Sequence, residues 1–343
     1  MAEIVLIHGI GAQDASALTL MGTWLPALAG GITNAGYPDI AASILGGKIT
    51  VAMAFYGDLF LPPAVLNQAA VSPGPDAGDG GAPATAGQTQ RIQADPFTES
   101  LAEEIVRRAA NPIRHTPDTP AAAGAVAAAD APKTAGGSGA PLGPGLQNYF
   151  LQELDKLTWI KKRIFGIAED TVVPALKQVG IYLDDPTIHD DVQQIVAELV
   201  GDDTRVIIGH SLGSVVAYNF AVSGLKQELP LLLTLGSPLG DQTLVYNRLE
   251  PRPPEYPPLV KQWVNISAHN DPVAANPNLV PDFGDIPQGC QLNSGWTVYN
   301  LAGGAHAIVD YLNQEQVGST VARVFAGVTA ATAAPAAPAT PTT

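Results

Sequence analysis

Cysteine, aromatic side chains and charged side chains are all scarce in this 343-residue sequence. Its one cysteine, Cys290, excludes a disulfide within the chain. No group of cysteine and histidine residues has the spacing of a metal site, and we expect neither a metal nor a cofactor. Aromatic residues make up 6% of the chain and charged residues 14%. No window of about 18 residues is apolar throughout, so we expect no stable membrane insertion.

Positive charge is the scarcest of all, with 17 Lys and Arg against 32 Asp and Glu, for a net charge of -15. An acidic surface repels the phosphates of nucleic acids and of anionic lipids. The one basic run, Lys161-Lys162-Arg163, is typical of a solvated helix face. The chain opens directly on an apolar segment at residues 3–8, without the basic region and cleavage site of a secretory signal. We therefore expect a soluble, cytoplasmic protein that binds no nucleic acid.

Hydrophobic residues make up 46% of the chain, which is enough for a sizeable core. Short apolar runs predict buried strands at 3–8, 49–55, 205–209, 230–235, 262–267 and 296–301. Helical patterns predict helices at about 15–29, 190–199, 306–315 and 319–329. Alternating buried strands and helices indicate an α/β fold with a doubly wound, mostly parallel sheet flanked by helices. We expect one domain over residues 1–329.

The block at 57–180 interrupts this alternation. Residues 62–95 and 111–145 consist mainly of Pro, Gly, Ala, Ser and Thr, and such segments bury too little apolar surface to offset the entropy of ordering. We predict that they are disordered, with helices at 97–110, 146–166 and 169–180. The block is interpreted as an insertion that partly covers a site at the sheet edge, or else as a loop and packing helices with no such role. The Ala/Pro/Thr tail at 330–343 is also expected to be disordered.

The most informative stretch is 205–218, in which a β-branched run leads through Gly-His-Ser-Leu-Gly into an apolar helix. A strand, G-x-S-x-G and a helix form the context in which a serine hydroxyl is raised above the sheet on a strained turn. Gly209 and Gly213 flank Ser211 at positions where a side chain would not fit. The pattern favours a nucleophile at Ser211. The alternative is an ordinary turn whose serine caps the helix.

A serine nucleophile needs a base within hydrogen-bonding reach and an acid that orients this base. Of the six histidines, His306 follows the last predicted strand in a Gly-rich loop and is the favoured base, with His269 as the weaker candidate. Asp271 directly follows a predicted strand and is the favoured acid, while Asp241 remains an alternative. The chain order Ser211, Asp271, His306 is that of α/β-hydrolases.

Attack by a serine also requires amides that stabilise the negative charge on the substrate oxygen. We expect Leu212, the residue after the nucleophile, to supply one amide and Ile10, or Gly9 beside it, to supply the other. Gly9 and His210 are predicted to contact the substrate. His8 is expected to shape the loop after the first strand and not to carry a proton.

These motifs resemble those of the α/β-hydrolase superfamily, and within it those of bacterial serine esterases and lipases. The matching segments are Ile-His-Gly-Ile-Gly (7–11), Gly-His-Ser-Leu-Gly (209–213), Leu-Gly-Ser-Pro-Leu (235–239), Asn-Asp-Pro-Val (270–273) and Gly-Ala-His-Ala (304–307). The resemblance covers residues 3–55 and 186–315, and the first antiparallel strands of the full fold have no counterpart. It implies a carboxylic ester hydrolase that acts on a small-molecule or lipid ester through an acyl-enzyme and a Ser-Asp-His triad. An acyltransferase or thioesterase on the same triad, and a non-catalytic binding module, remain alternatives, and the oligomeric state is open.

Overall fold

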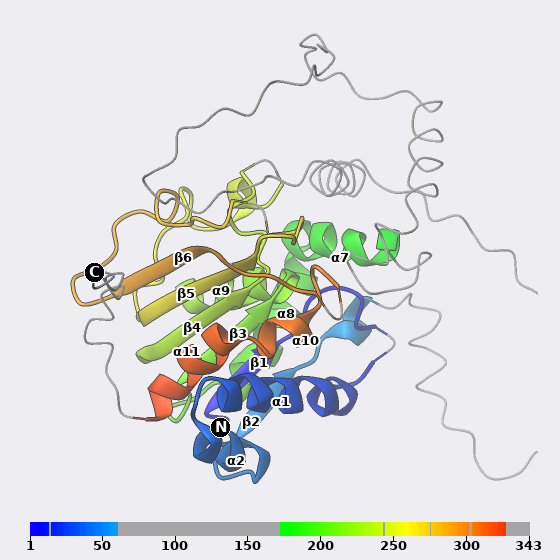
Figure 1. The fold of residues 1–343 in the computed structure, drawn as a ribbon. Coiled ribbons are helices and arrows are strands. Elements are labelled where there is room, and N and C mark those ends of the chain that lie inside the picture. Colours follow the sequence, from blue (N-terminus) through cyan, green and yellow to red (C-terminus); the bar gives the residue numbers. More distant parts are fainter. Residues whose placement is uncertain (14, 61–171, 243, 275, 302–303, 327–343) are drawn as a thin grey trace, which may run out of the picture.

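The structure is a computed structural model that describes residues 1–13, 15–60, 172–242, 244–274, 276–301 and 304–326 (Figure 1). Most of the predicted insertion at 57–180 lies outside the described residues. The same holds for the low-complexity segments at 62–95 and 111–145, for the helices predicted at 97–110 and 146–166, and for the tail at 330–343.

The described residues form one six-stranded sheet in which every neighbouring pair of strands is parallel. In the order in which they lie side by side, the strands are β2 (Val51–Ala54), β1 (Ile4–Ile7), β3 (Val206–His210), β4 (Leu229–Leu235), β5 (Val260–Ala268) and β6 (Gln291–Val298). The chain therefore winds outward from β1 in both directions. This confirms the predicted α/β fold, and the sheet is parallel throughout, where a mostly parallel one was expected.

Helices cover both faces of the sheet (Figure 1). One face carries α1 (Ala17–Asn34), α2 (Pro38–Leu45), α10 (Ile308–Leu312) and α11 (Glu315–Phe325). The other carries α7 (Val172–Asp184), α8 (Pro186–Leu199) and α9 (Leu212–Ser223). Short 3-10 turns lie at Gly57–Phe60 and Tyr246–Arg248. Within the described parts of the chain, no helix has both the length and the apolar character that crossing a bilayer requires.

Each central strand is buried on both faces, which is why its sequence is a continuous apolar run. Strand β1 illustrates this, because Ile4 and Leu6 pack into the cluster under α1 while Val5 and Ile7 pack into the cluster under α9. All four side chains are fully buried. The two cores fix β1 and β3 as the centre of the molecule, and the segments that leave these strands are held by the same packing.

Several elements differ from the sequence-based expectations: α8 begins at Pro186, α10 covers only Ile308–Leu312, and α11 runs from Glu315 to Phe325. Helix α2 was not predicted, although Pro38 at its first turn is a typical start signal, because its eight residues give too short a pattern. Strand β6 begins at Gln291 and not at residue 296. It lies at the edge of the sheet and is half-exposed, so its first half is polar and lacks the apolar run that marks the central strands.

Candidate functional site

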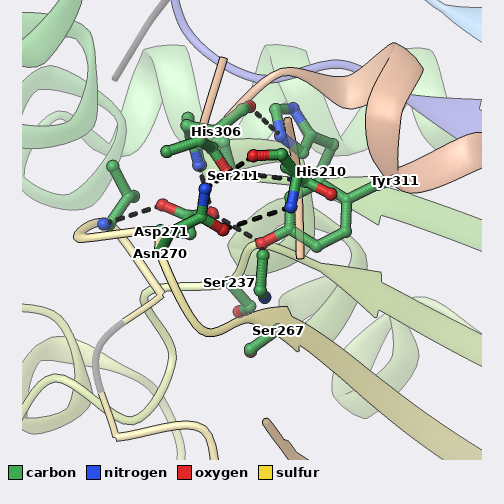
Figure 2. A network of polar contacts seen from close by, with 12 residues as sticks. His210, Ser211, Ser237, Ser267, Asn270, Asp271, His306 and Tyr311 are labelled. Atoms are coloured by element: carbon green, nitrogen blue, oxygen red, sulfur yellow. Dashed lines mark hydrogen bonds and ion pairs between the residues drawn. The ribbon is translucent and has the colours of Figure 1, made fainter. Parts of the chain in front are cut away.

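The predicted site residues lie at the carboxyl ends of the parallel strands, where ligands bind in sheets of this kind. Ser211 follows β3, Asp271 follows β5, and His306 lies between β6 and α10. Figure 2 shows these three residues together with His210 and Tyr311 in one network of polar contacts. Ser211 and His306 are 95 residues apart in the sequence. Because the strands of the sheet all run in the same direction, both residues lie at the same edge.

Ser211 has a strained backbone, with φ 55° and ψ -127°, a conformation that a residue with a side chain rarely adopts. The strain is imposed by close main-chain packing on both sides of the serine. A Cβ at Gly209 would lie 2.4 Å from the Gly213 carbonyl oxygen, and a Cβ at Gly213 would lie 2.2 Å from the Ile7 carbonyl oxygen. The Ser211 side chain makes no capping hydrogen bond to α9, so the structure does not support the alternative of a simple cap.

The Ser214 side chain stabilises this turn. The Ser214 hydroxyl hydrogen-bonds both to the Ser211 carbonyl oxygen and to the Ser237 hydroxyl, the latter at 2.7 Å. The Ser214 hydroxyl is the donor to both oxygens, and its single proton points to one of them at a time. The Ser237 oxygen in turn accepts from the Leu239 amide. This buried chain of hydrogen bonds links the strained turn to the segment that follows β4.

Asp271 and His306 form a buried pair, with 2.8 Å between Asp271 Oδ2 and His306 Nδ1. Their side chains are 0% and 5% exposed. The other carboxylate oxygen, Oδ1, accepts a hydrogen bond from the Val273 amide. The alternative acid, Asp241, accepts from the Leu244 amide within its own loop. The alternative base, His269, has its ring stacked on Tyr299 at 4.7 Å.

The segments that carry His306 and Ser211 are connected through their neighbours, Gly236 and His210. The Ser211 amide donates to the Leu235 carbonyl, and a Cβ on the next residue, Gly236, would lie 3.2 Å from His306 Cε1. The His210 side chain, adjacent to the serine, hydrogen-bonds to the His306 carbonyl oxygen at 3.0 Å. Figure 2 draws Ser211 and His306 within the same network of polar contacts. The Asp271–His306 pair and Ser211 thus form one cluster.

His8 is a neutral histidine with a fixed tautomer. The Tyr56 amide donates to His8 Nε2, so the proton lies on Nδ1, which donates to the Gly9 carbonyl at 2.7 Å. Burial lowers the pKa of His8 to about 4, against a smaller opposing effect of the bond to Gly9. The Tyr56 hydroxyl donates to the His8 carbonyl oxygen. These contacts hold the loop after β1, the structural role that the sequence predicts for His8.

His210 is also neutral. Its Nε2 must carry the proton, because it donates to the carbonyl of His306. Burial, and then the proximity of His306, lower the pKa of His210 well below its usual value. The two imidazole rings lie 4.6 Å apart. The side chain predicted to contact the substrate therefore binds the backbone of the candidate base.

The loop after β1 lies against Ser211. A Cβ at Gly9 would lie 2.8 Å from Ser211 Cβ and 3.4 Å from its hydroxyl oxygen, so any larger residue at position 9 would crowd the serine side chain. Ile10, half-buried, follows directly, and Leu212 is the first residue of α9. The predicted amide donors at Ile10 and Leu212 thus belong to two segments that meet at the serine.

Sequence reasoning missed three sets of residues that shape the site. Tyr311 donates to Asp271 Oδ2 at 2.6 Å. Asn270 and Asn300 are joined twice, because the Asn270 side chain donates to the Asn300 carbonyl and accepts from the Asn300 amide. Gln178 accepts from the Gly11 amide at 3.1 Å, next to Ile10. Asn270 adjoins the predicted acid and could have been found on that ground; the other partners are too distant in sequence.

Within the residues that the structure describes, no group of three or more His, Cys, Asp or Glu side chains is placed to hold a metal ion. No family model matches the chain, and no curated protein or solved structure matches it. The function of this chain is therefore inferred from the geometry of the site.

Proposed function

We propose that this protein is a serine hydrolase of the α/β-hydrolase type that cleaves a carboxylic ester through an acyl-enzyme. The observation that carries the proposal is the buried contact between Asp271 and His306, next to a serine on a strained turn. A structural serine gains nothing from this conformation, whereas a nucleophile gains a hydroxyl raised above the strand end at a helix N-terminus. Three residue types in these roles, on strand ends far apart in sequence, favour catalysis over binding alone.

In the proposed mechanism each of these side chains has a separate role. His306 takes the proton of the Ser211 hydroxyl as it attacks the ester carbonyl and returns it to the leaving alcohol. Asp271 holds Nδ1 of the imidazole, which directs Nε2 to the serine and stabilises the imidazolium. The amides of Leu212 and Ile10 receive the charge that develops on the carbonyl oxygen, and one such donor contributes about 3 to 4 kcal/mol. Water then attacks the acyl-enzyme, with His306 as the base.

The test measures hydrolysis of p-nitrophenyl esters of graded acyl length by the wild type and by three variants. Ser211→Ala and His306→Ala are expected to lower kcat by about 10⁶-fold, and Asp271→Asn by about 10⁴-fold. Asp241→Asn is the matched control, because it changes a buried carboxylate at the neighbouring strand end. Activity that survives Asp271→Asn but is lost in Asp241→Asn would transfer the acid role to Asp241.

A fluorophosphonate probe gives a substrate-independent measurement. Peptide mapping of the labelled wild type is expected to place the phosphonyl group on Ser211, and Ser211→Ala is expected to remain unlabelled. Folded protein that does not react at Ser211 would contradict the proposal and favour a non-catalytic binding module.

A further inference from the structure

The Tyr311 hydroxyl hydrogen-bonds to the carboxylate oxygen that also holds the imidazole of the proposed triad. Asp271 Oδ2 receives two hydrogen bonds, one from His306 Nδ1 at 2.8 Å and one from the Tyr311 hydroxyl at 2.6 Å. All three side chains are buried. Both donors come from the segment around α10, five residues apart, whereas the carboxylate comes from the loop after β5.

The direction of the Tyr311 hydrogen bond is fixed by a third partner. The Ala268 amide donates to the Tyr311 oxygen at 2.9 Å. Since the tyrosine oxygen accepts from Ala268, its own proton points to Asp271. Burial, and then the charge of Asp271, raise the pKa of Tyr311 well above its usual value, so the donor proton is kept at every working pH.

We infer that Tyr311 is a positioning residue, which fixes the Asp271 carboxylate and limits how strongly that carboxylate holds a proton on His306. The inference deepens the proposed function and rests on it for its catalytic meaning. A donor on Oδ2 disperses part of the negative charge that would otherwise stabilise the imidazolium. Among the described residues, Asp271 and the neutral His210 ring at the end of β3 also lie against His306. Tyr311 thus acts on the histidine through the carboxylate that the two share.

The test follows the protonation of His306 by NMR in protein labelled with ¹⁵N-histidine. Tyr311→Phe removes the donor, and the pKa of His306 is expected to rise by about half a unit, which is about threefold in the protonation constant. The acid limb of kcat/KM is expected to move to higher pH by the same amount, with a lower kcat and little change in KM. An unchanged or lowered pKa of His306 would overturn the inference.

Tyr256→Phe is the matched control. Tyr256 is equally buried, and its hydroxyl donates to the Gln291 carbonyl and not to Asp271. It should leave the titration of His306 unchanged. A second variant covers the case in which Tyr311→Phe does not fold: 3-fluorotyrosine at position 311 is a stronger donor and should lower the pKa of His306.

The two proposals can fail separately. The NMR titration needs no turnover, so a shift in Tyr311→Phe combined with an unreactive Ser211 would uphold the hydrogen-bond network and reject the hydrolase. A reactive Ser211 with an unshifted His306 would do the reverse.

Discussion

Ser211 and His306 lie at the same edge of the sheet, but the segments that carry them are held in different ways. The turn around Ser211 is held by main-chain packing, since Gly209 and Gly213 approach neighbouring carbonyls closely. The loops that carry Asp271 and His306 are joined by side-chain hydrogen bonds, through Asn270 and Tyr311. The turn around Ser211 requires glycine at two positions, whereas the loops that carry Asp271 and His306 require polar side chains at Asn270 and Tyr311.

This difference has an energetic consequence. Main-chain overlap cannot be relieved by a rotamer change, so a substitution in the turn acts as a single large perturbation. A network of hydrogen bonds to side chains can lose one member at a time, each with a moderate effect. A single substitution in the turn should therefore have a large effect on stability, whereas single substitutions in the acid and base loops should each have a moderate one.

The largest effect on stability is expected from Gly213→Ala, a substitution in the turn. Its new methyl group would lie 2.2 Å from the Ile7 carbonyl oxygen and 2.4 Å from that of His8, both on the central strand end. We expect a loss of about 4 kcal/mol or more in the free energy of unfolding, measured by urea denaturation. Gly22→Ala is the control, because a Cβ there meets nothing within 4 Å, and it should stabilise α1 by up to about 1 kcal/mol. Equal effects of the two changes would refute the packing argument.

The second prediction concerns pH and the buried His8 beside the turn. The unfolded chain binds a proton on this histidine near its ordinary pKa of 6.5, but the folded protein does so only near 4. The unfolded state therefore holds more protons between these values, and stability falls as the pH is lowered from about 6.5 to about 4. The His8 share is roughly 3 kcal/mol, and His210 acts in the same direction.

Denaturation curves at a series of pH values check this. His8→Asn should flatten the dependence between pH 4 and 6.5, whereas His189→Asn, at a half-exposed position outside the site, should leave it as in the wild type. If the free energy of unfolding depended on pH equally in both variants, His8 would not be the cause of that dependence.

The smallest effect is expected in the second half of the site. The Asn300 side chain donates to the Ala305 carbonyl at 3.0 Å, directly before His306. Asn300→Ala leaves that buried carbonyl without this donor, and we expect a loss of about 1 to 3 kcal/mol in stability with a reduced kcat. Asn293→Ala, at an exposed position of β6, should stay within about 0.5 kcal/mol of the wild type. A larger effect at Asn293 than at Asn300 would contradict the role of the loop contact.

The sequence predicts the first half of the site better than the second for the same physical reason. Close main-chain packing requires glycine at fixed offsets, so the turn at 209–213 is a local pattern that can be recognised directly. The contact between Tyr311 and Asp271 joins residues 40 positions apart and depends on where α10 stands relative to the end of β5. No local pattern encodes that relation.

The fold follows the same division. Strands β1, β3 and β4 are buried on both faces, so apolar runs predict them to within a residue or two. Strand β6 forms an edge with mixed burial, and its residues 291–295 precede the strand predicted at 296–301. Helix α7 was predicted at 169–180 and extends over Val172–Asp184, where it brings Gln178 to the loop after β1.

The placement of both Asp271 donors on one short segment has a consequence for how the site could open. A shift of the chain around α10 would withdraw the imidazole and the phenol together, since His306 and Tyr311 are only five residues apart. A buried carboxylate that lost both partners would keep only the Val273 amide as a donor, which is a high-energy state. Movement of this segment away from Asp271 as a whole is therefore disfavoured.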